Sequence, residues 1–258
     1  MPDACWFLPL SDSDTRFRAT ADTAGPWSPH AQHGGPPAAL LTRALERCSP
    51  REEMLLSRIT MEILGPVPVD EMTVQARVAR AGRRVERLEA VLSAAGRPVM
   101  TAAAWRVLRT GLGAPAADVS LPPLPEQATD PAEFSSAGYL QSMEWRIVSG
   151  GWTTPGPAAV WTRMRGALVA GEEPSGLQRL MGVADSGNGV SAVLDLSRFW
   201  FINPELTVHV HREPAGEWLL LDAQTTISAG GTGLATSVLS DQQGPVGRGA
   251  QSLLVGER

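Results

Sequence analysis

The chain of 258 residues is 43% apolar, which is enough to bury the core of one large domain or of two ordinary ones. A net charge of −5, the lack of lysine and the lack of long arginine runs exclude the basic footprint of a nucleic-acid-binding protein. Two cysteines are too few for a disulfide framework or a zinc site, and no apolar run reaches the roughly 18 residues that span a bilayer.

The N-terminal segment is acidic. A signal peptide needs a basic start followed by an apolar run, whereas this segment carries Asp3, Asp12 and Asp14. We therefore expect a cytoplasmic protein with no nucleic-acid partner, no membrane partner, no metal and no cofactor.

The first half of the chain predicts a strand, a helix and then four strands. A strand over 15–20 precedes the Gly34-Gly35 pair, and the apolar stretch over 36–47 predicts a helix. Its first turn tolerates two prolines, because the N–H that proline lacks would be unpaired there anyway. Residues 58–108 alternate apolar and polar side chains, and turns rich in glycine and proline divide them into antiparallel strands.

The second half repeats this order after a linker. Residues 110–137 are rich in glycine and proline and have little periodic pattern. We expect strands over 139–148 and 160–168, a helix over 174–183 and four strands within 205–255. We interpret the run 185–189 as a helix stop, which could border a cleft.

The two strand regions share one pattern at a constant offset of 147 residues (206 − 59), so that Ile59 returns as Leu206. At three positions the copies differ in chemistry: Arg58, Val78 and Ala104 of the first copy become Glu205, Thr225 and Gln251 of the second. The three side chains of the second copy are suited to hydrolysis, and those of the first are not. We therefore predict an α+β fold of two tandem repeats, in which each antiparallel sheet wraps around a central helix and the second repeat carries the site.

A series of short motifs runs through both halves in a fixed order. In the first half they cover 33–41, 64–68 and 96–99, and in the second 203–212, 216–218, 221–225, 231–235 and 247–251. This series resembles the double-hotdog acyl-CoA thioesterases of the thioesterase II type. The resemblance implies a double hotdog, which we divide into an N-terminal hotdog (1–112), a linker (113–137) and a C-terminal hotdog (138–258). It also implies an acyl-CoA or related acyl-thioester substrate, and it leaves room for a homo-oligomer.

The same resemblance implies hydrolysis by a water molecule that Asp, Thr and Gln hold near the thioester carbonyl. By position these roles fall on Glu205, which replaces the family's Asp, on Thr225 or its neighbour Thr226, and on Gln251. Strand alternation puts Thr225 on the apolar face and Thr226 on the polar one, so we prefer Thr225. In this hypothesis Glu205 is the general base.

The predicted substrate-binding residues are His33, Gly34 and Gly35. The start of a helix presents unpaired backbone N–H groups, which could stabilise the oxyanion of the reaction. Glycines at this point also let a thioester approach closely.

Two other functions stay open. One is a non-catalytic hotdog that binds acyl or polyketide chains, in which Glu205 is a surface carboxylate. The other is a hotdog dehydratase or hydratase, in which His33 would be the acid or base. The pair His209 and His211 lies on one face of a strand, but the sequence offers no third ligand and therefore predicts no metal site.

Overall fold

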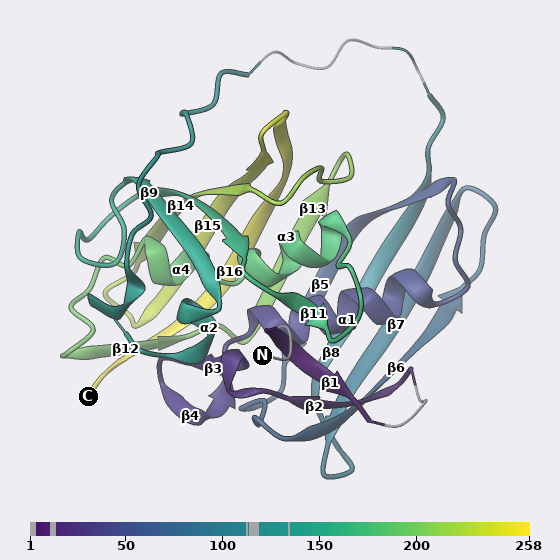
Figure 1. The fold of residues 1–258 in the computed structure, drawn as a ribbon, viewed down its shortest axis with the longest axis horizontal. Coiled ribbons are helices and arrows are strands. Elements are labelled where there is room, and N and C mark those ends of the chain that lie inside the picture. Colours follow the sequence, from purple (N-terminus) through teal and green to yellow (C-terminus); the bar gives the residue numbers. More distant parts are fainter. Residues whose placement is uncertain (1–3, 11–13, 112, 114–118, 134) are drawn as a thin grey trace.

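The structure is a computed structural model that describes residues 4–10, 14–111, 113, 119–133 and 135–258. Its main feature is one large curved sheet around two central helices, α1 (Gly35–Arg47) and α3 (Gly176–Ala184), as Figure 1 shows. The strands of the first half are β1 (Cys5–Pro9), β2 (Arg16–Ala19), β5 (Met54–Ile63), β6 (Glu71–Arg80), β7 (Val85–Ala94) and β8 (Arg97–Leu108). The strands of the second half are β9 (Met143–Ser149), β10 (Ala158–Met164), β11 (Ala167–Val169), β12 (Phe199–Ile202), β13 (Glu205–Val210), β14 (Leu219–Ile227), β15 (Thr232–Asp241) and β16 (Gly244–Glu257).

The smaller elements lie around this framework. The short strands β3 (Ala24–Gly25) and β4 (Ser28–Gln32) pair with each other, and α2 (Gly138–Gln141) and α4 (Gly187–Val190) are single helical turns. The main sheet runs in the order β11-β1-β2-β6-β7-β8-β5-β13-β16-β15-β14-β10-β9, with β12 paired to β16. Each half thus contributes one continuous block of strands, except that β11 of the second half pairs in parallel with β1 of the first.

The two halves meet at β5 and β13, which pair antiparallel at the middle of the sheet. Thr60 lies opposite Thr207, and the Thr207 hydroxyl donates to that of Thr60 over 3.2 Å. These two residues are also equivalent under the offset of 147 residues in the sequence. A residue that pairs with its own equivalent lies on a twofold axis, so an approximate axis relates the halves through this pair. The repeat in the sequence therefore corresponds to the approximate twofold symmetry of the fold.

The helices α1 and α3 pack antiparallel against each other. A Cβ atom added to Gly35 would lie 2.2 Å from the carbonyl oxygen of Gly182, so only glycine allows this approach. The apolar side chains of α1 that face the sheet, among them Leu40 and Leu41, are completely buried. Because of this packing, the start of α1 lies beside the end of α3, where the candidate site forms.

The predicted architecture is confirmed: the fold is an α+β double hotdog, with helices close to the predicted ranges 36–47 and 174–183. Two details of the prediction were wrong. Residues 139–141 belong to the helical turn α2, and the expected strand over 160–168 is interrupted between β10 and β11. Among the described residues, no helix is long and apolar enough to cross a membrane.

The division into 1–112, 113–137 and 138–258 stays a prediction. Some residues of these three ranges lie outside the described part of the chain, namely 1–3, 11–13, 112, 114–118 and 134. The described part of the expected linker packs on the second half, since Thr129 N donates to Trp145 O over 2.7 Å and Arg146 donates to Pro125 O over 2.7 Å.

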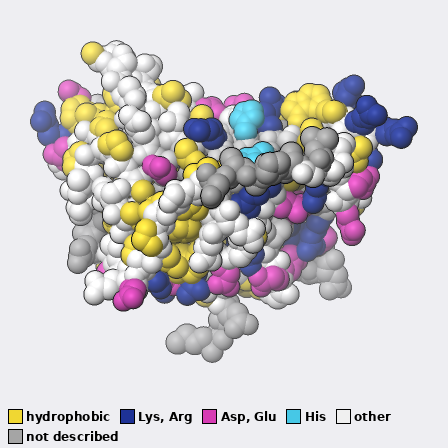
Figure 2. Space-filling model, turned by 90° about the horizontal axis from the view of Figure 1, so that it is seen from above, with side chains coloured by type: hydrophobic (Ala, Val, Ile, Leu, Met, Phe, Trp, Pro, Cys, Tyr) yellow, Lys and Arg dark blue, Asp and Glu magenta, His cyan; other side chains and the backbone are white. Residues whose placement is uncertain are grey.

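Acidic and basic side chains are intermixed on the face of the molecule in Figure 2.

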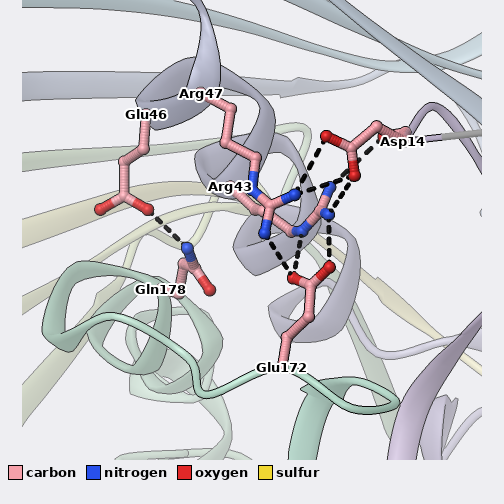
Figure 3. A network of polar contacts seen from close by, with 6 residues as sticks. All are labelled: Asp14, Arg43, Glu46, Arg47, Glu172 and Gln178. Carbon is pink, nitrogen blue, oxygen red and sulfur yellow. Dashed lines mark hydrogen bonds and ion pairs between the residues drawn. The ribbon is translucent and has the colours of Figure 1, made fainter. Parts of the chain in front are cut away.

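A polar network at the far end of α1 is shown in Figure 3. Arg43, whose side chain is 2% exposed, contacts Asp14 and Glu172, and Arg47 contacts the same two carboxylates. This network connects α1 to the segment that precedes α3.

Glu46 in the same network gives a pH-dependent prediction. Ser175 Oγ and Gln178 Nε2 donate to its carboxylate over 2.8 and 2.5 Å. Burial raises the pKa of Glu46 above its ordinary value of 4.5, although these two hydrogen bonds oppose the shift. The folded state therefore favours the protonated form, and this contribution to stability is present below pH 4.5 and lost as the pH rises through the folded-state pKa.

Glu46→Gln imitates the protonated form and does not titrate. We expect the free energy of unfolding of Glu46→Gln, relative to wild type, to increase between pH 4.5 and 7.5. Denaturant unfolding at a series of pH values measures this difference. The exposed Glu52→Gln is the control and should follow wild type; parallel curves for Glu46→Gln and wild type would contradict the prediction.

Candidate active site

The candidate site is centred on Asp185, directly after the last residue of α3. The residue is 5% exposed. Its Oδ1 accepts hydrogen bonds from Asn203 Nδ2 over 2.8 Å and from Gln251 Nε2 over 3.1 Å. Its Oδ2 lies 3.3 Å from His33 Nδ1. Since both amide donors are on Oδ1, Oδ2 is the oxygen that these amides leave available to another group.

Gln251 lies on the inner face of β16 and is 2% exposed. Besides Asp185 Oδ1, its Nε2 reaches the Asp185 backbone oxygen over 3.1 Å, and its Oε1 accepts from Asn188 N over 3.2 Å. Both ends of the amide are therefore engaged. Gln251 fixes the position of Asp185 and of the first residues of α4.

His33 enters the site from the first half of the chain, just before α1. Its ring stacks on Tyr139 with the centroids 3.8 Å apart and the planes 3° from parallel. Its Nδ1 accepts a hydrogen bond from Gly35 N over 3.1 Å. Burial lowers the pKa of His33 below its ordinary value, and the nearby Asp185 carboxylate opposes this shift. The ring is therefore neutral at neutral pH.

Two neighbours explain the local sequence. A Cβ atom added to Gly34 would lie 2.6 Å from Asp185 Oδ2, so glycine is required where the two halves meet. The Tyr139 hydroxyl donates to Gly182 O over 2.8 Å and is 2.8 Å from Ser186 Oγ. Tyr139 thus ties the end of α3 to the ring of His33.

A pocket of about 320 Å³ lies against this cluster. Of its residues, His33 and Ser186 come from the cluster, and Trp27, Trp152 and Phe201 are among the apolar ones. An apolar pocket with a few polar groups at its wall is the usual form of a small-molecule site. The pocket therefore offers a place for an apolar ligand next to the Asp185 cluster.

The structure does not bring Glu205 to Gln251. Thr207 pairs with Ala250 in the ladder of β13 and β16, and continuing this register puts Leu206 opposite Gln251. Successive side chains of a strand point to opposite faces, so Glu205 points away from the face of Gln251. Its carboxylate instead accepts a hydrogen bond from Ser252 N over 2.6 Å. We therefore replace Glu205 by Asp185 as the candidate for the catalytic carboxylate.

Thr225 lies on the inner face of β14 and is 7% exposed, whereas Thr226 is exposed. It shares a row of the sheet with Gln251, because Ala235 of β15 pairs with both. Its hydroxyl is 2.8 Å from Ser191 Oγ, and Ser191 Oγ itself donates to Gly187 O over 2.8 Å. A hydroxyl has one proton, so Thr225 is the donor to Ser191. Thr225 thus supports α4, and its hydroxyl is hydrogen-bonded to Ser191 and not to Asp185.

The sequence pattern pointed to a helix stop at Asp185 that could border a cleft, and it gave no role to Asn203. The sequence does hold a signal for a functional carboxylate at this point. Asp185 directly follows the run 180–184, which is apolar apart from Gly182. Such a residue is also usual where a helix ends, so sequence alone did not separate the two roles. Within the described part of the chain, no three His, Cys, Asp or Glu residues are placed to hold a metal ion.

The wrapped sheet and the paired central helices define the protein as a hotdog-fold protein with an internal duplication. The sequence matches the profile of the acyl-CoA thioesterase N-terminal domain over residues 23–107 and that of the C-terminal domain over residues 118–255. The chain belongs to the acyl-CoA thioesterase family. A comparison with curated proteins found no significant match.

Solved structures with the same fold span nearly the whole chain. A conserved hotdog protein of unknown function from Alicyclobacillus acidocaldarius is 17% identical, with 96% of each chain covered and a TM-score of 0.74. A candidate thioesterase II from Thermobifida fusca is 18% identical, with 97% of this chain and 95% of that one covered and a TM-score of 0.73. The acyl-CoA thioesterase II TesB2 of Mycobacterium marinum is 16% identical, with 96% and 94% covered and a TM-score of 0.69.

Proposed function

We propose that the protein is an acyl-CoA thioesterase, which hydrolyses an acyl thioester to a free acid and a thiol. The observation that carries the proposal is the buried Asp185 carboxylate, which Asn203 and Gln251 hold on one oxygen and which lies 3.3 Å from His33, a residue that lines the apolar pocket. Family membership supports the same reaction.

In the proposed mechanism Asp185 is the general base. A water molecule gives a proton to Asp185 Oδ2 while its oxygen attacks the thioester carbonyl carbon. The carbon–sulfur bond then breaks, and the leaving thiolate takes the proton from Asp185. Asn203 and Gln251 are positioning residues, because they hold the carboxylate and do not need to contact the substrate. No covalent intermediate is required.

One observation favours a second candidate, a dehydratase or hydratase. His33 Nδ1 lies 3.3 Å from Asp185 Oδ2, and His33 lines the pocket. An imidazole and a carboxyl group together could remove a proton next to a thioester carbonyl and protonate a departing hydroxyl group. This reaction changes the acyl chain and leaves the thioester bond intact.

A substrate panel separates these functions. Purified protein is given acyl-CoA and acyl-carrier-protein thioesters of several chain lengths, together with 3-hydroxyacyl and enoyl thioesters, and both free thiol and the enoyl group are measured. We expect thiol release from saturated acyl-CoA that is lost in Asp185→Asn. Enoyl turnover without thiol release would support the dehydratase, and acyl binding with neither product would support a non-catalytic acyl-binding protein.

A further inference from the structure

We propose that His33 is a catalytic residue that donates a hydrogen bond from Nε2–H to the carbonyl oxygen of the thioester. In this role it stabilises the oxyanion and gives up no proton. The inference rests on the proposed thioesterase function and adds to it a group from the other half of the chain. It also differs from the acid or base role that a dehydratase would require of the same side chain.

The tautomer of His33 follows from its contact with Gly35. Two groups contact Nδ1: the N–H of Gly35 donates to it over 3.1 Å, and Asp185 Oδ2, which by itself would favour a proton there, lies 3.3 Å away. We assign the tautomer from the shorter, directed N–H contact, which requires the lone pair of Nδ1 and therefore a nitrogen without a proton. A neutral imidazole has one proton, which then belongs to Nε2. Burial lowers the pKa of His33 and keeps the ring in this neutral form.

The position of the ring leaves Nε2 available to a ligand. Stacking on Tyr139 fixes the plane of the ring, and Nδ1 is the nitrogen that faces Gly35 and Asp185. Within the described part of the chain, Nε2 makes no hydrogen bond to the protein, and the atom is not fully buried. Since the side chain is 15% exposed and lines the pocket, Nε2–H is a donor that a bound ligand can reach.

Three of the backbone positions expected to supply donors at this point do not do so. The start of α1 was predicted to supply backbone N–H groups for the oxyanion. The N–H of Gly35 is engaged by His33, and Pro36 and Pro37 have none. The N–H of Gly35 therefore acts indirectly: it orients the imidazole, and the imidazole offers a donor.

The two nitrogens of the His33 ring lie on different sides of the site. Asp185 Oδ2 lies on the Nδ1 side of the ring, where it can hold the attacking water, while Nε2 lies on the other side of the same ring. A neutral imidazole in such a position stabilises developing negative charge without becoming charged itself.

Two substitutions test the role. His33→Ala removes the donor, and we expect kcat for acyl-CoA hydrolysis to fall by about 10²–10³-fold with little change in KM. His33→Gln can present an amide N–H near the position of Nε2 but cannot act as a base, so it should recover most of kcat. Thermal unfolding of both variants checks that they fold, and Asp185→Asn gives the rate without the base.

The tautomer is measured independently of activity. Proton–nitrogen NMR correlation of the imidazole rings distinguishes a protonated Nε2 from a protonated Nδ1, and the chain has only 4 histidines to assign. We expect His33 to show a protonated Nε2 and a bare Nδ1 at pH 7.

The outcomes distinguish this inference from the proposed function. If the wild-type protein releases no thiol from any thioester, the proposed function fails and the inference fails with it. If the wild type is active, the inference alone is wrong when folded His33→Ala keeps full kcat. It is also wrong when His33→Gln is as slow as His33→Ala, or when NMR finds the proton on Nδ1.

Discussion

Asp185→Asn should lower kcat for thioester hydrolysis by about 10²–10⁴-fold, the usual contribution of a general base. The amide has nearly the shape of the carboxylate and can still accept the hydrogen bond from Asn203, but it cannot take a proton from water. The position of Asp185 depends on contacts from three separate segments, so the substitution changes the chemistry more than the packing. Thiol release under saturating acyl-CoA measures the effect.

Glu205→Gln is the matched control for Asp185→Asn. Both substitutions neutralise one carboxylate with little change in volume. Both carboxylates are also near Asn203, since Asp185 accepts a hydrogen bond from it and Glu205 follows it closely in the sequence. Glu205 points to the outer face and accepts from Ser252 N, so we expect Glu205→Gln to keep the wild-type kcat. A large loss in Glu205→Gln, with little loss in Asp185→Asn, would return the role of the base to Glu205.

Arg106→Leu should destabilise the fold by about 3–5 kcal/mol, because it leaves a buried carboxylate without its partner. Arg106 of β8 lies opposite Glu86 of β7, and the two residues are 3% and 5% exposed. Arg106 Nε donates to Glu86 over 2.9 Å, and Nη2 donates to the same carboxylate and to Ser49 O, just after α1. Denaturant unfolding gives the change in the free energy of unfolding.

A second pair of residues provides the control for Arg106→Leu. Arg77 of β6 lies opposite Glu89 of β7 in the same sheet, but its side chain is 73% exposed. We expect Arg77→Leu to cost less than about 1 kcal/mol, as is usual for surface ion pairs. The double variant Glu86→Leu, Arg106→Leu removes both buried charges and should recover part of the stability. Equal losses in Arg106→Leu and Arg77→Leu would contradict this account.

Local patterns were sufficient to predict the two central helices, most of the long strands and the side chains on their inner faces. The apolar stretch after Gly34-Gly35 became α1, and the alternation in 205–255 became strands whose buried faces include Thr225 and Gln251. These features depend on residues close together in the chain, since the side-chain period of a strand or helix fixes which residues share a face.

The change of the candidate base from Glu205 to Asp185 has a simple physical reason. The equivalent positions of the two copies include residues of both faces, and an offset between copies does not tell which face is buried. A shift of one residue in a strand moves a side chain to the opposite face. Glu205 and its neighbour Leu206 differ by that one step, and only Leu206 is directed to the interior.

The sequence by itself determined the duplication, the α+β double-hotdog architecture, the family and the place of Gln251 and Thr225 on inner faces. Only the tertiary structure decided which carboxylate meets Gln251, because Asp185, Asn203 and Gln251 are brought together by the packing of α3 against the sheet. It also decided that His33 of the first half reaches the site of the second. That contact depends on the close approach of α1 and α3 at Gly35 and Gly182, which local sequence patterns do not encode.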